Sequence, residues 1–230
     1  MRRFDFILLD ADNTLFDFDL AEHQALRSAM TAHGLPFTPE TEGLYLSINR
    51  SLWAAFDRGE VEQDWLTVER FRRLNAALGG KSDPVRLNED YLTALGRCNH
   101  LLPGALELCR ELAQAGCVLA VATNGVARVQ RARMEASPLT AYIPHLFISQ
   151  ELGARKPQTA FFDPILKQLG VIDKSRCLMV GDSLTSDILG GQNAGLPTAW
   201  YDPRGKENKT AILPTCRVAD HSELKEWILL

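Results

Sequence analysis

Short runs of apolar residues that end in acidic or polar side chains recur along the chain. Residues 4–10, 117–123 and 177–182 share this plan, and each run predicts a buried parallel strand, because such strands are apolar on both faces. Residues 146–149 and 198–201 predict two further strands. Helical periodicity fills the intervals, at about residues 104–115, 126–136, 158–169 and 186–194. This alternation predicts an α/β fold with a Rossmann-like parallel sheet as its core.

Residues 16–100 interrupt this alternation. Their apolar positions recur at helical spacing in three sets, Leu44, Ile48, Leu52 and Phe56, then Phe71, Leu74 and Leu78, then Leu87, Tyr91 and Leu95. Residues 34–36, 58–59 and 79–84 carry the glycines and prolines expected between helices. We therefore expect a core of residues 1–15 and 101–230 with an inserted helical-bundle cap of residues 16–100. An insertion directly after the first acidic strand end predicts a lid over the strand ends.

Composition and charge limit the classes of function. The chain has 230 residues, of which 46% are hydrophobic and 23% charged, as is usual for a globular protein large enough for a core and an inserted small domain. A net charge of −4 offers no electrostatic surface for a long nucleic acid, which we therefore do not expect as a partner. Nothing in the composition predicts the oligomeric state, and a monomer or a weak homodimer is expected.

Localisation is also constrained by the sequence. Asp10 and Asp12 end the first apolar run far short of the hydrophobic region of a signal peptide, and no stretch approaches the length of a membrane span. The five cysteines form an odd set without a CxxC pair, which favours free thiols in a reducing compartment. A cytoplasmic protein without membrane contact is therefore expected.

Acidic and polar side chains stand at the predicted carboxyl ends of the strands. Ligands bind at this edge of an open parallel sheet, so the side chains are expected to converge there. They are Asp10, Asp12, Thr123, Asn124, Asp182 and Asp187. Four carboxylates at one point repel each other unless a hard divalent cation with oxygen ligands lies among them. The pattern therefore predicts a Mg²⁺ site.

The residues at these strand ends resemble the four motifs of the haloacid dehalogenase-like superfamily. In chain order the motifs are Asp10-Ala-Asp12-Asn-Thr14, Thr123-Asn124, Lys156-Pro157, and Gly181-Asp182-Ser183 with Asp187. The resemblance implies that Asp10 is a nucleophile that forms an aspartyl-phosphate and also binds the metal. It implies that Asp12 is the general acid and base and that its backbone carbonyl is a metal ligand. The alternative for Asp10 and Asp12 is a solvated turn or a calcium loop, but Thr14-Leu15 stands where an EF-hand loop needs an acidic residue and glycine.

The remaining motifs complete the implied site. Thr123 and Asn124 would bind the phosphate, although Thr-Asn-Gly after a strand is also a common helix cap and turn. Lys156 would neutralise both phosphate and nucleophile in the transition state, and its place before Pro157 favours it over Arg155. Asp182 would bind the metal. Asp187 would brace the site through water or Lys156, or would interact with a helix dipole as any first-turn carboxylate does.

The inserted region bears on the substrate. Asn49, Arg50 and Trp53 combine an amide, a cation and an indole on one predicted helix. This segment and the first motif resemble the house-cleaning pyrimidine 5′-nucleotidases of bacteria, which implies a nucleoside monophosphate as the small-molecule substrate. Trp53 is equally well explained as part of the core of the cap.

Several other functions share parts of this pattern. A sugar-phosphate or phosphoglycolate-type phosphatase is the main alternative, and a phosphomutase would share all four motifs. A metal-free dehalogenase on this fold has no need of an acid two residues after the nucleophile, so Asp12 argues against it. A catalytically dead binding module is disfavoured because Asp10, Asp12, Lys156 and Asp182 are all present.

Overall fold

The computed structural model describes residues 2–229, which divide into two compact units. One unit comprises the chain up to Phe18 together with Asn99 onward, and the other comprises Asp19–Cys98. No helix in residues 2–229 is long and apolar enough to cross a membrane.

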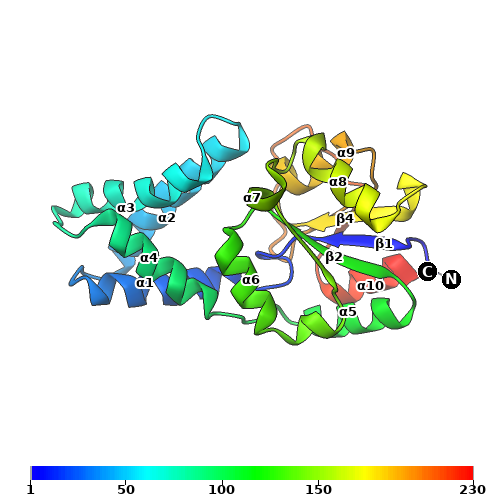
Figure 1. Ribbon diagram of the computed structural model, residues 1–230, viewed down its shortest axis with the longest axis horizontal. Helices are drawn as coiled ribbons and strands as arrows, with labels where there is room; N and C mark the ends of the chain where they lie inside the picture. The colour runs from blue at the N-terminus through cyan, green and yellow to red at the C-terminus, as the bar shows by residue number, and fades with distance from the viewer. Residues whose placement is uncertain (1, 230) are drawn as a thin grey trace. The chain divides into compact units, whose positions relative to one another are not determined.

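The first unit is built on a parallel sheet (Figure 1). Within the described residues the sheet has six strands in the order β3-β2-β1-β4-β5-β6, and every neighbouring pair is parallel. The strands are β1 (Phe6–Leu9), β2 (Val118–Thr123), β3 (His145–Ile148), β4 (Cys177–Gly181), β5 (Thr198–Tyr201) and β6 (Cys216–Val218). Strand order reverses at β1, since β2 lies on one side of it and β4 on the other. A ligand site is therefore expected at the carboxyl ends of these three strands.

Both faces of the sheet are buried, because alternate residues of each strand point to opposite sides. Ile7 and Leu9 pack with the helices α5 (Ala105–Gln114) and α10 (His221–Leu229) in one apolar cluster. Leu8 packs with α8 (Thr159–Leu169) in another. Further helical segments connect the strands, namely α6 (Ala127–Glu135), a 3₁₀ turn Pro138–Ala141, α7 (Ser149–Leu152), a 3₁₀ turn Lys174–Arg176, a π-helical turn Leu184–Ile188 and α9 (Leu189–Asn193).

The second unit is helical. It is formed by α1 (Phe18–Ala32), α2 (Pro39–Asp57), α3 (Gln63–Leu78) and α4 (Pro84–Gly96). Helix α2 begins at a capping box, in which the Thr38 side chain accepts from the backbone of Thr41 and the Thr41 side chain accepts from that of Thr38. The rings of Tyr45, Phe71 and Tyr91 pack against one another, with centroids 5.3–5.9 Å apart. An aromatic cluster therefore joins α2, α3 and α4.

The predicted α/β fold with a parallel sheet is confirmed, and the differences are local. The strand β6 and the helix α10 were not predicted, because Cys216–Val218 is only three residues long and only Val218 in it is buried. The predicted apolar stripe of α2 was partly wrong. Its buried positions are Thr41, Tyr45, Asn49, Leu52 and Phe56 rather than Leu44 and Ile48. Thr41 and Asn49 can occupy this buried face because each has hydrogen-bond partners inside the unit.

Candidate active site

Asp10 follows β1 directly and lies at the centre of the strand ends. Its backbone N–H donates to the carbonyl of Val180 on β4 at 2.9 Å, which extends the pairing of the two strands to the carboxylate. The side chain is 7% exposed, and its Oδ1 accepts from Nζ of Lys156 at 2.6 Å. The carboxylate is therefore held at the sheet edge by the Lys156 ammonium group.

Lys156 is a fully buried cation with three fixed partners. Its Nζ donates to Asp10 Oδ1 at 2.6 Å and to the carbonyl of Ala122 at 2.7 Å, and it lies 2.7 Å from Asp187 Oδ1. Asn124 holds the backbone of Lys156 from both sides, because its Oδ1 accepts from the Lys156 N–H and its Nδ2 donates to the Lys156 carbonyl, both at 3.0 Å. Two hydrogen bonds and one ion pair thus hold the ammonium group in place.

Burial and mutual repulsion govern the charges of this cluster. Burial raises the pKa of Asp10 well above its usual value, and the neighbouring carboxylates of Asp187, Asp12 and Asp182 act in the same direction, whereas Lys156 opposes them. Burial alone would lower the pKa of Lys156, but Asp10 and Asp187 outweigh it and raise that pKa. Lys156 therefore stays a cation.

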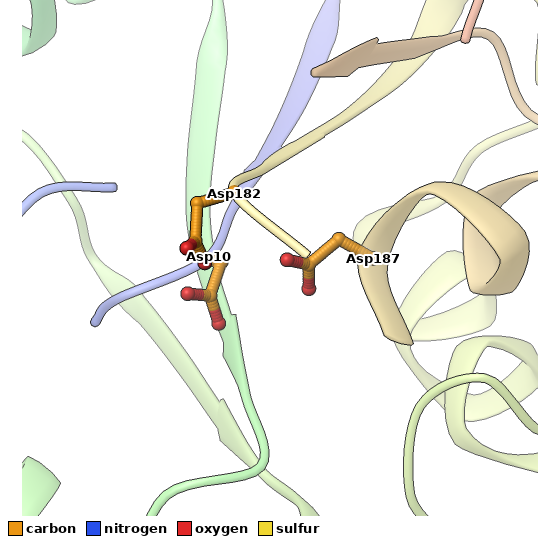
Figure 2. Close-up of side chains that lie close together, drawn as sticks. All are labelled: Asp10, Asp182 and Asp187. Atoms are coloured by element: carbon orange, nitrogen blue, oxygen red, sulfur yellow. The ribbon is translucent and has the colours of Figure 1, made fainter. Parts of the chain in front are cut away.

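Asp182 and Asp187 complete an acidic cluster (Figure 2). One oxygen atom from each of Asp10, Asp182 and Asp187 lies within 4.8 Å of the other two. Burial and the nearby Asp187 raise the pKa of Asp182 to about 7, although 24% of its side chain remains exposed. An all-oxygen set whose carboxylates repel one another fits a hard divalent cation such as Mg²⁺, which relieves that repulsion.

Gly181 allows Asp187 to reach this cluster. Asp187 is 1% exposed, and its Oδ2 accepts from the backbone N–H of Ser183 at 3.0 Å. A Cβ atom on Gly181 would lie 2.1 Å from that same oxygen. The absence of a side chain at Gly181 is therefore required for the close approach of Asp187.

Asp12 lies beside the cluster and is held by helix α6. Its Oδ2 accepts from Nε2 of Gln130 at 2.7 Å, and its Oδ1 forms an ion pair with Arg133. Both partners are buried, Gln130 at 1% and Arg133 at 0% exposure, whereas 26% of the Asp12 side chain is exposed. Sequence reasoning missed Gln130 and Arg133, because nothing in the spacing of α6 indicates a partner more than 100 residues away.

The side chains of the second motif, Thr123 and Asn124, form hydrogen bonds within the protein. Thr123 is 1% exposed, and its Oγ1 accepts from the backbone N–H of Gly125 at 3.0 Å. The side-chain amide of Asn124 is engaged with Lys156, so this residue joins the second and third motifs. Contact of Thr123 and Asn124 with phosphate stays a prediction.

The structure does not bring together the three residues predicted for substrate selection in the helical unit. Asn49 is 4% exposed, and its Nδ2 donates to Glu22 Oε1 at 2.8 Å while its Oδ1 accepts from Arg70 at 3.3 Å. Arg50 is exposed, and its Nε donates to the carbonyl of Leu46. The Trp53 ring packs edge-on against Phe56 with centroids 5.4 Å apart. Asn49 thus has a structural role in the unit, and substrate contact by all three residues stays a prediction.

Comparisons with known proteins place this geometry in a family. The family model of haloacid dehalogenase-like hydrolases matches residues 4–195. The chain is 35% identical to the pyrimidine 5′-nucleotidase PynA of Streptococcus pneumoniae over 98% of its length and 95% of that protein. It is 36% identical to the pyrimidine 5′-nucleotidase YjjG of Escherichia coli, over 98% of each chain. The crystal structure of the HAD-hydrolase YfnB of Bacillus subtilis, bound to magnesium, superposes with a TM-score of 0.94 at 33% identity and covers 100% of both chains.

Proposed function

The chain belongs to the haloacid dehalogenase-like hydrolases, and from that premise we propose that it is a magnesium-dependent 5′-nucleotidase selective for pyrimidine nucleoside monophosphates. That it hydrolyses phosphoric monoesters follows from the family and the relatives; the metal, the mechanism and the substrate are the proposal. The observation that carries it is the 2.6 Å contact between Asp10 and Lys156 beside the carboxylate of Asp182. A nucleophile, a fixed cation and an oxygen-rich cation site then meet at one sheet edge.

In the proposed reaction Asp10 attacks the phosphorus atom. A bond forms between a carboxylate oxygen of Asp10 and phosphorus, and the bond from phosphorus to the ester oxygen breaks. Asp12 gives its proton to the departing oxygen. It then takes a proton from the water that attacks the aspartyl-phosphate, so that inorganic phosphate leaves and both aspartates return to their starting state.

Lys156 and the second motif stabilise charge in this scheme. The ammonium group of Lys156 is held by two hydrogen bonds and an ion pair and needs little reorganisation as negative charge shifts from Asp10 to the phosphoryl oxygens. Thr123 and the backbone N–H groups that follow it would donate to those oxygens at the start of α6. Asn124 would act through the backbone of Lys156, which it holds in place.

The residues present fit Mg²⁺. Carboxylate oxygens of Asp10 and Asp182 and the backbone carbonyl of Asp12 would hold the ion, and Asp187 would keep Lys156 oriented beside it. When bound, the ion neutralises negative charge on the phosphate and fixes its orientation. The magnesium in the YfnB structure, at 33% identity, supports this part of the proposal.

The pyrimidine preference rests on the relatives. PynA and YjjG are named for this activity and align over nearly the whole chain, the helical unit included. A base that stacks on an aromatic ring such as Trp53 gains about 1–3 kcal/mol, which corresponds to preferences of roughly tenfold to hundredfold. A sugar-phosphate phosphatase is the alternative outcome.

The chemistry is tested with p-nitrophenyl phosphate. Activity should disappear in EDTA and return with excess Mg²⁺, and Asp10→Asn should abolish turnover while the protein keeps its helical content by circular dichroism. Full activity in the chelator would rule out the metal requirement. An Asp10→Asn variant with the wild-type rate would remove Asp10 as the nucleophile.

Selectivity is tested by kcat/KM for UMP, dUMP, dTMP, AMP and a panel of sugar phosphates. Trp53→Leu should reduce the preference for pyrimidines and leave p-nitrophenyl phosphate hydrolysis within about twofold of wild type. Trp65→Leu is the matched control, since Trp65 belongs to the same unit and is 48% exposed. Faster turnover of any sugar phosphate than of every nucleotide would refute the nucleotidase assignment and leave the phosphatase chemistry standing.

A further inference from the structure

We propose that Gln130 and Arg133 are positioning residues that orient Asp12 for its work as general acid and base. This inference rests on the proposed function, in which Asp12 carries the proton. It begins from their spacing on α6, since residues three apart on a helix lie on the same face. Both side chains leave that face toward Asp12, one to each carboxylate oxygen.

The two contacts restrict Asp12 without covering it. A carboxylate bound at both oxygens cannot turn about its Cβ–Cγ bond, so its orientation is set by α6. A guanidinium group can only donate, so the oxygen that faces Arg133 remains an acceptor throughout the cycle. The proton that passes between leaving group, Asp12 and water is then carried by Oδ2, which keeps a lone pair beyond the one that Gln130 engages.

Burying the Arg133 guanidinium group lowers the stability of the fold unless the group is paired with Asp12. It is 0% exposed, and its Nε and Nη2 have no hydrogen-bond partner within the described residues. Its guanidinium carbon lies 4.4 Å from the centre of the Phe16 ring, which offers a face to the cation but no acceptor. An apolar side chain would fill the same space without unsatisfied donors, so packing alone does not explain an arginine here. The ion pair with Asp12 explains why an arginine stands at this position.

Gln130 is connected to the phosphate-binding motif through Gly125. A Cβ atom on Gly125 would lie 2.1 Å from Gln130 Nε2 and 2.9 Å from its Cδ. The backbone of Gly125 lies outside the left-handed region, so an alanine there would displace the Gln130 side chain without straining the backbone. Gly125 thus leaves the space through which Gln130 reaches Asp12.

The step that this arrangement controls can be isolated with p-nitrophenyl phosphate. Its leaving group departs without a proton, so the first turnover needs no acid, whereas hydrolysis of the aspartyl-phosphate still needs a base. Gln130→Leu and Arg133→Met should therefore keep a burst of p-nitrophenolate and slow the later hydrolysis roughly 10-fold to 100-fold. KM should change by less than about threefold, and acid-labile phosphoprotein should accumulate. Arg133→Lys, which keeps the charge, should recover part of the rate.

Double variants test whether Gln130 acts through Asp12. In an Asp12→Asn background Gln130→Leu should slow phosphoenzyme hydrolysis by no more than about twofold, because the group that it positions is already lost. Gly125→Ala should slow the wild type and add less than about twofold to Gln130→Ala. Gly43→Ala on α2, where a new Cβ meets nothing within 4 Å, is the control for the glycine substitution and should leave the rate unchanged.

The outcomes separate this inference from the proposed function. Folded Gln130 and Arg133 variants that hydrolyse the phosphoenzyme at the wild-type rate or faster would overturn the positioning role, as would equal slowing in the Asp12→Asn background. If Arg133→Met does not fold, Gln130→Leu and Gly125→Ala decide the matter, because neither removes a charge. A wild-type chain that releases no phosphate from any monoester would overturn the phosphatase proposal itself, and this inference with it.

Discussion

Replacing Glu22 with glutamine should change how the free energy of unfolding depends on pH. Glu22 lies on α1 and is 6% exposed. Its Oε1 accepts from Asn49 Nδ2 at 2.8 Å and lies 3.5 Å from the hydroxyl of Tyr91. Burial raises the pKa of this carboxyl from 4.5 to about 7, with Arg70 opposing the rise and Asp19 adding to it.

The sign of the effect follows from proton binding. Below pH 4.5 the carboxyl is protonated in both states, so it contributes no pH dependence. Between pH 4.5 and about 7 the unfolded chain releases this proton while the folded protein keeps it, so stability falls as pH rises. Above about pH 7 both forms are ionised and the loss is complete. The difference between the two pKa values corresponds to a loss of about 3 kcal/mol.

The Glu22→Gln variant removes this titration and keeps the size and the acceptor oxygen of the side chain. Relative to wild type, the variant should become more stable by about 2–3 kcal/mol as pH rises from 5 to 8. Urea unfolding at four pH values in this range, followed by circular dichroism and by tryptophan fluorescence, measures the difference. Other titrating groups are the same in both proteins, so their contributions cancel in the difference between the two free energies of unfolding. Glu89→Gln, on the exposed side of α4, controls for the loss of one carboxylate from the net charge. A difference that stays constant with pH would refute the reasoning, since Glu22 would then ionise in the folded protein as it does in the unfolded chain.

Two further predictions test close contacts in the α/β unit. Gly181→Ala should force Asp187 away from Lys156, which should lower kcat at least about tenfold and the free energy of unfolding by about 1–3 kcal/mol. Gly43→Ala, the control, should change neither quantity. Wild-type kinetics in Gly181→Ala would disprove the steric requirement. His221→Phe should lower the free energy of unfolding by about 2–4 kcal/mol in urea titrations. The ring nitrogens of this buried histidine lie 2.7 Å and 2.8 Å from two backbone carbonyls, at least one of which would lose its hydrogen-bond donor. An unfolding midpoint equal to that of wild type would show that water replaces the histidine at both carbonyls.

The sequence by itself determined the parallel sheet and the meeting of its acidic strand ends. Apolar runs such as Phe6–Leu9 are buried on both faces whatever surrounds them, and the carboxyl ends of parallel strands share one edge. Asp10 and Asp182, each directly after a strand, therefore had to approach one another. Such features can be predicted from the sequence because they depend on the apolar pattern of each strand and on where that strand ends.

Only the tertiary structure decided which polar groups outside those strand ends meet. Arg133 and Gln130 lie more than 100 residues from Asp12 in the chain, and no local period links them to it. Asn49 was predicted to contact a substrate, and that stays a prediction, but its bonds to Glu22 and Arg70 could not be predicted. They form because a buried carboxyl and a buried guanidinium both require partners. The spacing of apolar residues predicts which face of a helix is buried. The pairing of polar atoms inside that face depends on distances that exist only after the elements have packed.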